Sequence, residues 1–97
     1  MSESKQNKNF EILYNIICER AKSKKNNSYT NKLLKYGPKK IAQKFGEESS
    51  ELIIDYLKGS KKRTIQEAAD VIYHLLVLLK SKNISIKDIN KELSNRQ

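Results

Sequence analysis

The spacing of apolar residues predicts an all-α chain. Apolar residues recur at intervals of three and four between Phe10 and Ala21, between Ile41 and Tyr56, and between Ile86 and Leu93. This spacing places side chains on one face of a helix. No segment shows the alternation of apolar and polar residues that is typical of a strand. We therefore expect a helical bundle of four to five helices, forming a single domain over residues 10–97.

Glycine and proline divide the middle of the chain into helices. Gly37 should end a short helix over residues 29–36. Pro38 suits the first position of the next helix, because its missing N–H has no partner there in any case. Gly59 is a natural C-terminal stop for that second helix. The pattern thus predicts a short helix followed by a long one that ends near Lys58.

The remaining helix ends are predicted from capping residues. Thr64 and Glu67 have the spacing of a capping box, so we expect a helix to begin at Thr64. Asn83 should end that helix, and Ser85 can cap a last one. The polar residues 23–28 should form a loop. Residues 1–9 lack periodicity and resemble no signal peptide, so we expect a disordered tail there.

Length and composition limit the size of the core. The chain has 97 residues, of which 37% are hydrophobic, and chains this small bury a modest core. From Val71 to Leu79 apolar residues point in nearly every helical direction, so this helix should be central to the core or to an interface. The run is too short to span a bilayer, and we expect no membrane partner. Self-association, at least as a homodimer, is expected.

The single cysteine, Cys18, excludes an internal disulfide and suits a reducing cytoplasm. The net charge of +9 at first suggests a nucleic-acid partner. However, residues 1–40 carry ten basic and three acidic side chains, whereas residues 45–57 carry four acidic side chains and no basic one. A small helical module binding RNA or DNA is therefore our third reading. A smaller anion, such as a polyphosphate nucleotide, would be attracted by the same charges.

Two acidic pairs carry the candidate chemistry. Glu48 and Glu51 share one helix face, and so do Glu67 and Asp70. Sixteen positions separate Glu51 from Glu67, and Gly59 lies between them, which is enough for an antiparallel helical hairpin. Four carboxylates that face one another repel unless a cation binds among them. Oxygen ligands with room for water and phosphate suit Mg²⁺. The sequence therefore predicts a magnesium site.

Each acid also has a structural explanation. E-x-x-E pairs are common on solvated helices, and Glu67 could serve as a capping residue. His74, one turn beyond Asp70, is more often a core or supporting group than a ligand. Glu48 is the hardest to explain, because it falls in the apolar stripe of its helix, where an unpaired carboxylate is costly. Lys40 and Lys44 flank that stripe and could hold phosphate charge.

Three segments resemble one enzyme family. They are Ser28-Tyr-Thr-x-x-Leu-Leu-x-x-Gly37, Lys40-Ile-Ala-Gln-Lys-x-Gly-Glu-Glu-x-x-Glu51 and Glu67-Ala-Ala-Asp-x-x-Tyr-His-Leu-Leu-Val-Leu-Leu79. Together they are similar to phosphoribosyl-ATP pyrophosphatases, the histidine-biosynthesis branch of the MazG-like all-α nucleotide pyrophosphatases. The paired acids are shared by the whole superfamily, whereas the first two segments are more specific to this branch.

The resemblance implies a Mg²⁺-dependent hydrolysis of phosphoribosyl-ATP, the second step of histidine synthesis, by a homodimer that completes the bundle. By this likeness Glu48, Glu51, Glu67 and Asp70 match the metal-binding acids. Glu47 matches a further family acid, and we expect Glu47, Glu48 and Glu51 to be catalytic. The substrate-binding residues that we expect are Tyr29, Thr30, Lys32, Lys40 and Lys44, with His74 supporting the metal ligands.

The main alternative keeps the chemistry and changes the substrate. A MazG-like enzyme that hydrolyses unwanted nucleoside triphosphates would use the same acids, and only the segment from Ser28 to Thr30 argues against it. Many phosphoribosyl-ATP pyrophosphatases are fused to a cyclohydrolase domain. This chain should be the free-standing form, since it ends at Gln97 without one.

Overall fold

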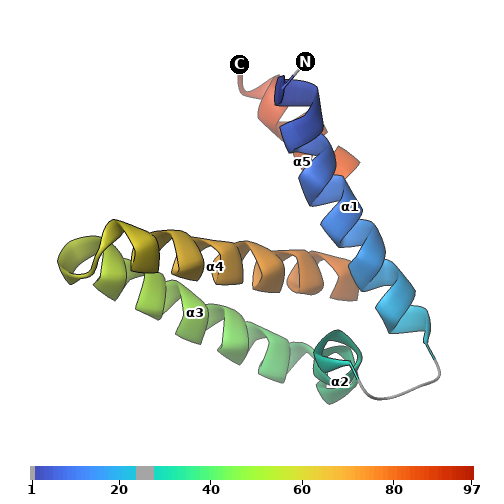
Figure 1. The fold of residues 1–97 in the computed structure, drawn as a ribbon. Helices are drawn as coiled ribbons and strands as arrows, with labels where there is room; N and C mark the ends of the chain where they lie inside the picture. The colour runs from blue at the N-terminus through green and yellow to red at the C-terminus, as the bar shows by residue number, and fades with distance from the viewer. Residues whose placement is uncertain (1, 24–27) are drawn as a thin grey trace.

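The computed structural model describes residues 2–23 and 28–97, and within these ranges it contains five α-helices and no strand (Figure 1). The helices are α1 (Ser2–Lys22), α2 (Tyr29–Tyr36), α3 (Pro38–Lys58), α4 (Lys61–Ser81) and α5 (Ile86–Asn95). The all-α prediction is confirmed. Most of the predicted loop, residues 24–27, lies outside the described residues, as does Met1.

The hairpin of α3 and α4 is the largest helix pair in the fold. The two helices run antiparallel and side by side in Figure 1, joined by a tight turn at one end. At the other end α2 packs against α3, and α1 packs against α4 with α5 beside it. Among the described residues no helix is both long and apolar enough to cross a lipid bilayer.

A small core lies where α1, α2 and the open end of the hairpin meet. Its buried apolar side chains are Ile17, Leu33, Ile41, Leu76, Val77 and Leu79. Burial of one such aliphatic side chain stabilises the fold by about 1.5–3 kcal/mol. Three of the six belong to the apolar run of α4, which confirms that this helix is central to the core.

The N-terminal helix is longer than the sequence predicts. α1 begins at Ser2, so its backbone includes most of residues 1–9, which we expected to be a disordered tail. Apolar periodicity cannot reveal such an extension, because it marks only the part of a helix that packs. Once the packed part has nucleated a helix, each added residue gains one further backbone hydrogen bond.

The observed start of α4 differs from the predicted start at Thr64. The helix begins at Lys61, and the N-cap is Ser60, whose Oγ accepts a hydrogen bond from the Arg63 amide at 3.1 Å. Thr64, the predicted N-cap, lies inside the first turn, and its hydroxyl donates to the backbone oxygens of Ser60 and Asp55. Serine is as good a cap as threonine, and the turn length favours Ser60. Glu67 therefore does not act as a capping residue of α4.

The other predicted helix ends are confirmed within two residues. Gly37 ends α2 in the left-handed region, at a φ of 97°, and Pro38 opens α3. Gly59 ends α3 for a different reason, since its φ is −94° and a Cβ there would lie 2.6 Å from Asp55 Oδ1. α4 ends at Ser81, two residues before Asn83, which has a φ of 57°. Ser85 and Asp88 form the capping box of α5.

Candidate metal centre and nucleotide pocket

The hairpin brings three of the four predicted metal ligands into one cluster. Glu48 of α3 and Glu67 and Asp70 of α4 each offer a carboxylate oxygen, and these oxygens all lie within 4.8 Å of one another. The antiparallel pairing of the two helices, joined by a turn of two residues, sets this register. One cation placed among the three oxygens could contact every member of the cluster.

Glu51, the fourth predicted ligand, interacts with the cluster electrostatically. Burial raises the pKa of Glu48, and the charge of Glu51 and a hydrogen bond with it raise that pKa further. Burial and the charge of Glu51 also raise the pKa of Glu67. Carboxylates that raise one another's pKa in this way are stabilised in their charged form by a nearby positive charge. The four acids therefore form one electrostatic unit.

Glu67 provides the test of whether a cation fits. Its side chain is only 6% exposed, and Oε1 accepts a hydrogen bond from Arg63 Nη2 at 2.9 Å. Oε2 is buried and has no hydrogen-bond partner within the described chain. A buried acceptor without a partner is costly, and a hard cation prefers carboxylate oxygens. The residues present therefore fit a divalent metal ion.

Glu47, predicted to be catalytic, lies outside this cluster. Its two carboxylate oxygens accept hydrogen bonds from Gln43 Nε2 at 2.8 Å and from Lys44 Nζ at 3.3 Å. The hydrogen bonds from Gln43 and Lys44 lower its pKa. Half of its side chain is exposed. In this structure Glu47 contacts the lysine side of the site and none of the clustered acids.

A pocket of about 200 Å³ lies along α2 and the start of α3. Its lining residues are Tyr29, Lys32, Leu33, Tyr36, Lys40 and Lys44. Four of the five predicted substrate-binding residues are therefore brought together. Tyr36 was not among the predicted substrate-binding residues. It lies seven positions after Tyr29 and therefore on the same face of α2. That interval is the signal that could have identified it.

Thr30, the fifth predicted substrate-binding residue, does not line the pocket. It is fully buried, and its Oγ1 is hydrogen-bonded to the Tyr73 hydroxyl of α4. The Tyr73 ring also stacks against that of Tyr29. One face of α2 lines the pocket and another faces the core. Tyr29 and Thr30 are neighbours in the sequence, and they therefore make different contacts. Thr30 fixes α2 onto α4.

His74 connects the pocket to the metal centre. The ring is buried, and its Nδ1 donates to the backbone oxygen of Asp70 at 2.7 Å, since a carbonyl can only accept. In the neutral imidazole Nε2 is then an acceptor, and the Tyr29 hydroxyl lies 3.0 Å from it. His74 therefore contacts Asp70 through its backbone, and within the described chain neither ring nitrogen is hydrogen-bonded to a carboxylate of the clustered acids.

Comparison with known proteins identifies the family. Residues 10–97 match the family described as "Phosphoribosyl-ATP pyrophosphohydrolase". A phosphoribosyl-ATP pyrophosphatase of Sulfolobus acidocaldarius is 49% identical over 84 residues, which cover 87% of this chain and 88% of the relative. One from Sulfurisphaera tokodaii is 44% identical over 86 residues, covering 89% and 92%. This chain belongs to the phosphoribosyl-ATP pyrophosphohydrolase family.

A third relative shows how the family domain is used elsewhere. A histidine biosynthesis bifunctional protein of Staphylococcus epidermidis is 42% identical over 95 residues, which are 98% of this chain but 45% of that relative. Nearly the whole of the present chain is thus similar to part of a longer bifunctional protein. Both acidic pairs and the pocket lie within residues 10–97, which match the family.

Proposed function

We propose that this chain hydrolyses phosphoribosyl-ATP to phosphoribosyl-AMP and pyrophosphate, the second step of histidine biosynthesis, and that Mg²⁺ is its cofactor. One observation carries the metal requirement: Glu67 is buried beside Glu48 and Asp70 with an oxygen that lacks a partner. Family membership supports the substrate. The proposed reaction adds one water molecule and breaks one phosphoanhydride bond.

The acids and the lysines would have separate roles in this reaction. Glu48, Glu51, Glu67 and Asp70 would hold Mg²⁺, which supplies positive charge for phosphate oxygens and lowers the pKa of a bound water. Glu48, in the cluster, and Glu51, beside it, remain proposed catalytic residues. Glu47 would act outside the acidic cluster by holding Lys44. The hydrogen bond to Glu47 raises the pKa of Lys44. Lys44 therefore stays charged.

The pocket would bind the nucleotide itself. Its three lysines carry charge that matches a polyphosphate. Its two tyrosine rings offer flat apolar surfaces, and aromatic rings stack on nucleobases with about 1–3 kcal/mol per base. We infer that Tyr29 and Tyr36 contact the base or a ribose, and that Lys32, Lys40 and Lys44 contact phosphate. Thr30 contributes by holding α2 in place.

The direct test is pyrophosphate release from phosphoribosyl-ATP, measured beside ATP and deoxynucleoside triphosphates. We expect turnover of phosphoribosyl-ATP with Mg²⁺, negligible turnover in EDTA, and recovery when Mg²⁺ is restored. Full activity in a metal-free preparation would refute the metal requirement. Faster turnover of ordinary nucleoside triphosphates would replace the proposed substrate with that of a MazG-like nucleotide pyrophosphohydrolase.

We also propose a homodimer, but its support is not the apolar run of α4 on which the sequence-based expectation rested. The apolar run of α4 is largely used in the core of one chain, whereas large apolar side chains remain exposed around the hairpin turn. These are Ile53, Ile54, Tyr56, Leu57 and Ile65, each at least 58% exposed. Large exposed apolar side chains gathered near one turn are characteristic of an interface. A cytoplasmic location remains our expectation, in keeping with the free thiol of Cys18.

A further inference from the structure

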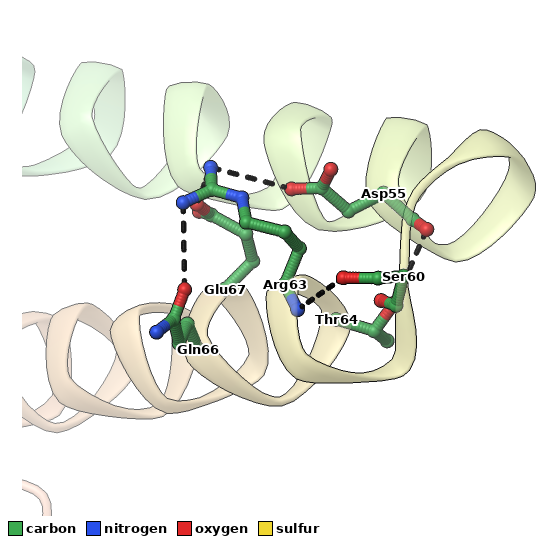
Figure 2. A network of polar contacts seen from close by, with 6 residues as sticks. All are labelled: Asp55, Ser60, Arg63, Thr64, Gln66 and Glu67. Atoms are coloured by element: carbon green, nitrogen blue, oxygen red, sulfur yellow. Dashed lines mark hydrogen bonds and ion pairs between the residues drawn. The ribbon is translucent and has the colours of Figure 1, made fainter.

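The basic first turn of α4 places one guanidinium between acids of two helices (Figure 2). Arg63 Nη2 lies 2.9 Å from Glu67 Oε1 on α4 and 3.7 Å from Asp55 Oδ2 on α3. Its other terminal nitrogen, Nη1, donates to Gln66 Oε1 at 3.4 Å. Lys61 and Lys62, in the same basic run, are exposed. Arg63 is thus the member of the run that reaches the metal centre.

The backbone around Arg63 holds it in this position. Ser60 caps the Arg63 amide, and the Thr64 hydroxyl donates to the backbone oxygen of Asp55 at 3.1 Å. The second of these bonds ties the first turn of α4 to the last turn of α3, as Figure 2 shows. Asp55, whose side chain is 19% exposed, forms a longer ion pair with the guanidinium from α3.

We propose that Arg63 positions Glu67 for metal binding. This inference rests on the proposed metal centre. By holding Oε1, Arg63 restricts the Glu67 carboxylate to one orientation and leaves Oε2, the buried oxygen without a partner, for the cation. Partners that hydrogen-bond to a ligating carboxylate orient it, and their loss typically costs 10- to 100-fold in metal affinity. Asp55 acts one step further away, by holding Arg63.

A contrasting role makes the opposite prediction. If Arg63 only neutralised the acids until a metal ion arrived, it would compete with that ion, and its removal would strengthen Mg²⁺ binding. A positioning residue behaves differently, because its removal lets the Glu67 carboxylate rotate and weakens binding. The geometry favours positioning, since Arg63 contacts one oxygen of Glu67 and has its own anchor on α3.

The experiment is a calorimetric titration of the full chain with Mg²⁺ alone, in the absence of nucleotide. Arg63→Gln removes the guanidinium, and Lys62→Gln is the matched control, because it makes the same change in net charge at an exposed neighbour. Arg63→Lys keeps the charge but loses the planar fork. The melting temperature of each metal-free variant is recorded first, so that the titrations compare folded proteins.

We expect Arg63→Gln to weaken Mg²⁺ binding by roughly 10- to 100-fold, Arg63→Lys to weaken it less, and Lys62→Gln to stay within about twofold of the wild type. Equal or tighter binding by Arg63→Gln, relative to Lys62→Gln, would overturn the inference. If Arg63→Gln does not fold, unchanged affinity in Arg63→Lys would overturn it equally. A wild-type chain that binds no Mg²⁺ would instead reject the metal centre itself.

Discussion

The Tyr29 hydroxyl on α2 donates a hydrogen bond to Nε2 of His74 on α4, across 3.0 Å. The opposite nitrogen of the same ring donates to the backbone of Asp70, one of the clustered acids. A single imidazole therefore joins the lysine-lined pocket to the acidic cluster. Two hydrogen bonds and one rigid ring thus connect Tyr29, which lines the pocket, to the backbone of Asp70.

Replacement of Tyr29 by Phe tests this connection. The variant keeps the ring that lines the pocket but leaves His74 Nε2 without its partner. We expect a loss of about 0.5–1.5 kcal/mol in the free energy of unfolding, the usual net value of one hydrogen bond, together with a higher KM for phosphoribosyl-ATP. Chemical denaturation and steady-state kinetics measure the two effects.

Tyr36→Phe is the matched control for Tyr29→Phe. Tyr36 lines the same pocket, but it is 73% exposed, and its hydroxyl has no hydrogen-bond partner in the described chain. Its removal should leave the free energy of unfolding unchanged. Equal destabilisation by the two substitutions would show that the bond to His74 has no special weight.

Glu48→Gln separates the metal site from the scaffold. The amide keeps the volume of the side chain but removes one ligand charge, so turnover should fall by orders of magnitude. In the metal-free protein three mutually repelling acids replace four, and the melting temperature should stay level or rise. Thermal unfolding in EDTA and turnover at limiting Mg²⁺ give the two measurements.

Glu47→Gln is the control for Glu48→Gln, because it makes the same chemical change at the next position. Glu47 contacts Gln43 and Lys44 and lies outside the acidic cluster. We expect a smaller loss of turnover and no change in Mg²⁺ affinity. Near-normal turnover in Glu48→Gln beside a large loss in Glu47→Gln would require a metal site rebuilt around Glu47.

The raised pKa values of Glu48 and Glu67 predict how stability responds to pH. Because these pKa values lie above the ordinary value of 4.5, the native state binds more protons than the unfolded chain in the pH range between the ordinary and the raised pKa values. Their contribution to stability therefore grows as the pH falls toward that value. Glu47 and Asp88 have lowered pKa values and lose their contribution only below their ordinary values of 4.5 and 3.8.

A comparison with Glu48→Gln isolates this effect. In EDTA the variant should melt level with or above the wild type at neutral pH, and any difference should shrink as the pH falls toward 4.5, the ordinary pKa of a glutamate. Saturating Mg²⁺ should reverse the order at neutral pH, since bound ligand stabilises the wild type more. A difference in melting temperature that does not depend on pH would contradict the raised pKa of Glu48.

The proposed homodimer is tested at Ile54, which is 59% exposed near the hairpin turn. Glutamate at this position would place a charge in the proposed interface, where it would lose its hydration. We expect sedimentation velocity at micromolar concentration to show a dimer for the wild type and a monomer for Ile54→Glu. Asn90→Glu on α5, an exposed position away from the turn, should remain dimeric. A wild-type chain that sediments as a stable, active monomer would remove the proposal.

The spacing of apolar residues and the positions of glycine, proline and capping residues were enough to predict which segments are helical. The short helix between Ser28 and Gly37 has the predicted bounds, because a capping serine and a glycine with positive φ define its ends locally. The predicted start of α4 was wrong by three residues, since Ser60 and Thr64 can both cap a helix and the structure uses Ser60. The extension of α1 to Ser2 leaves no trace in apolar spacing.

E-x-x-E and E-x-x-D spacing is enough to predict which acids can meet, because it sets the faces of two helices, and Gly59 sets the turn between them. Their separate arrangements follow from the packing of the helices: Glu48, Glu67 and Asp70 cluster, Glu51 acts beside them, and Glu47 turns toward Lys44. The partners of Tyr29 and Thr30 could not be predicted from the sequence, because both lie on another helix. Helical spacing gives only the direction of a side chain around its own axis, whereas these contacts depend on how the helix axes pack.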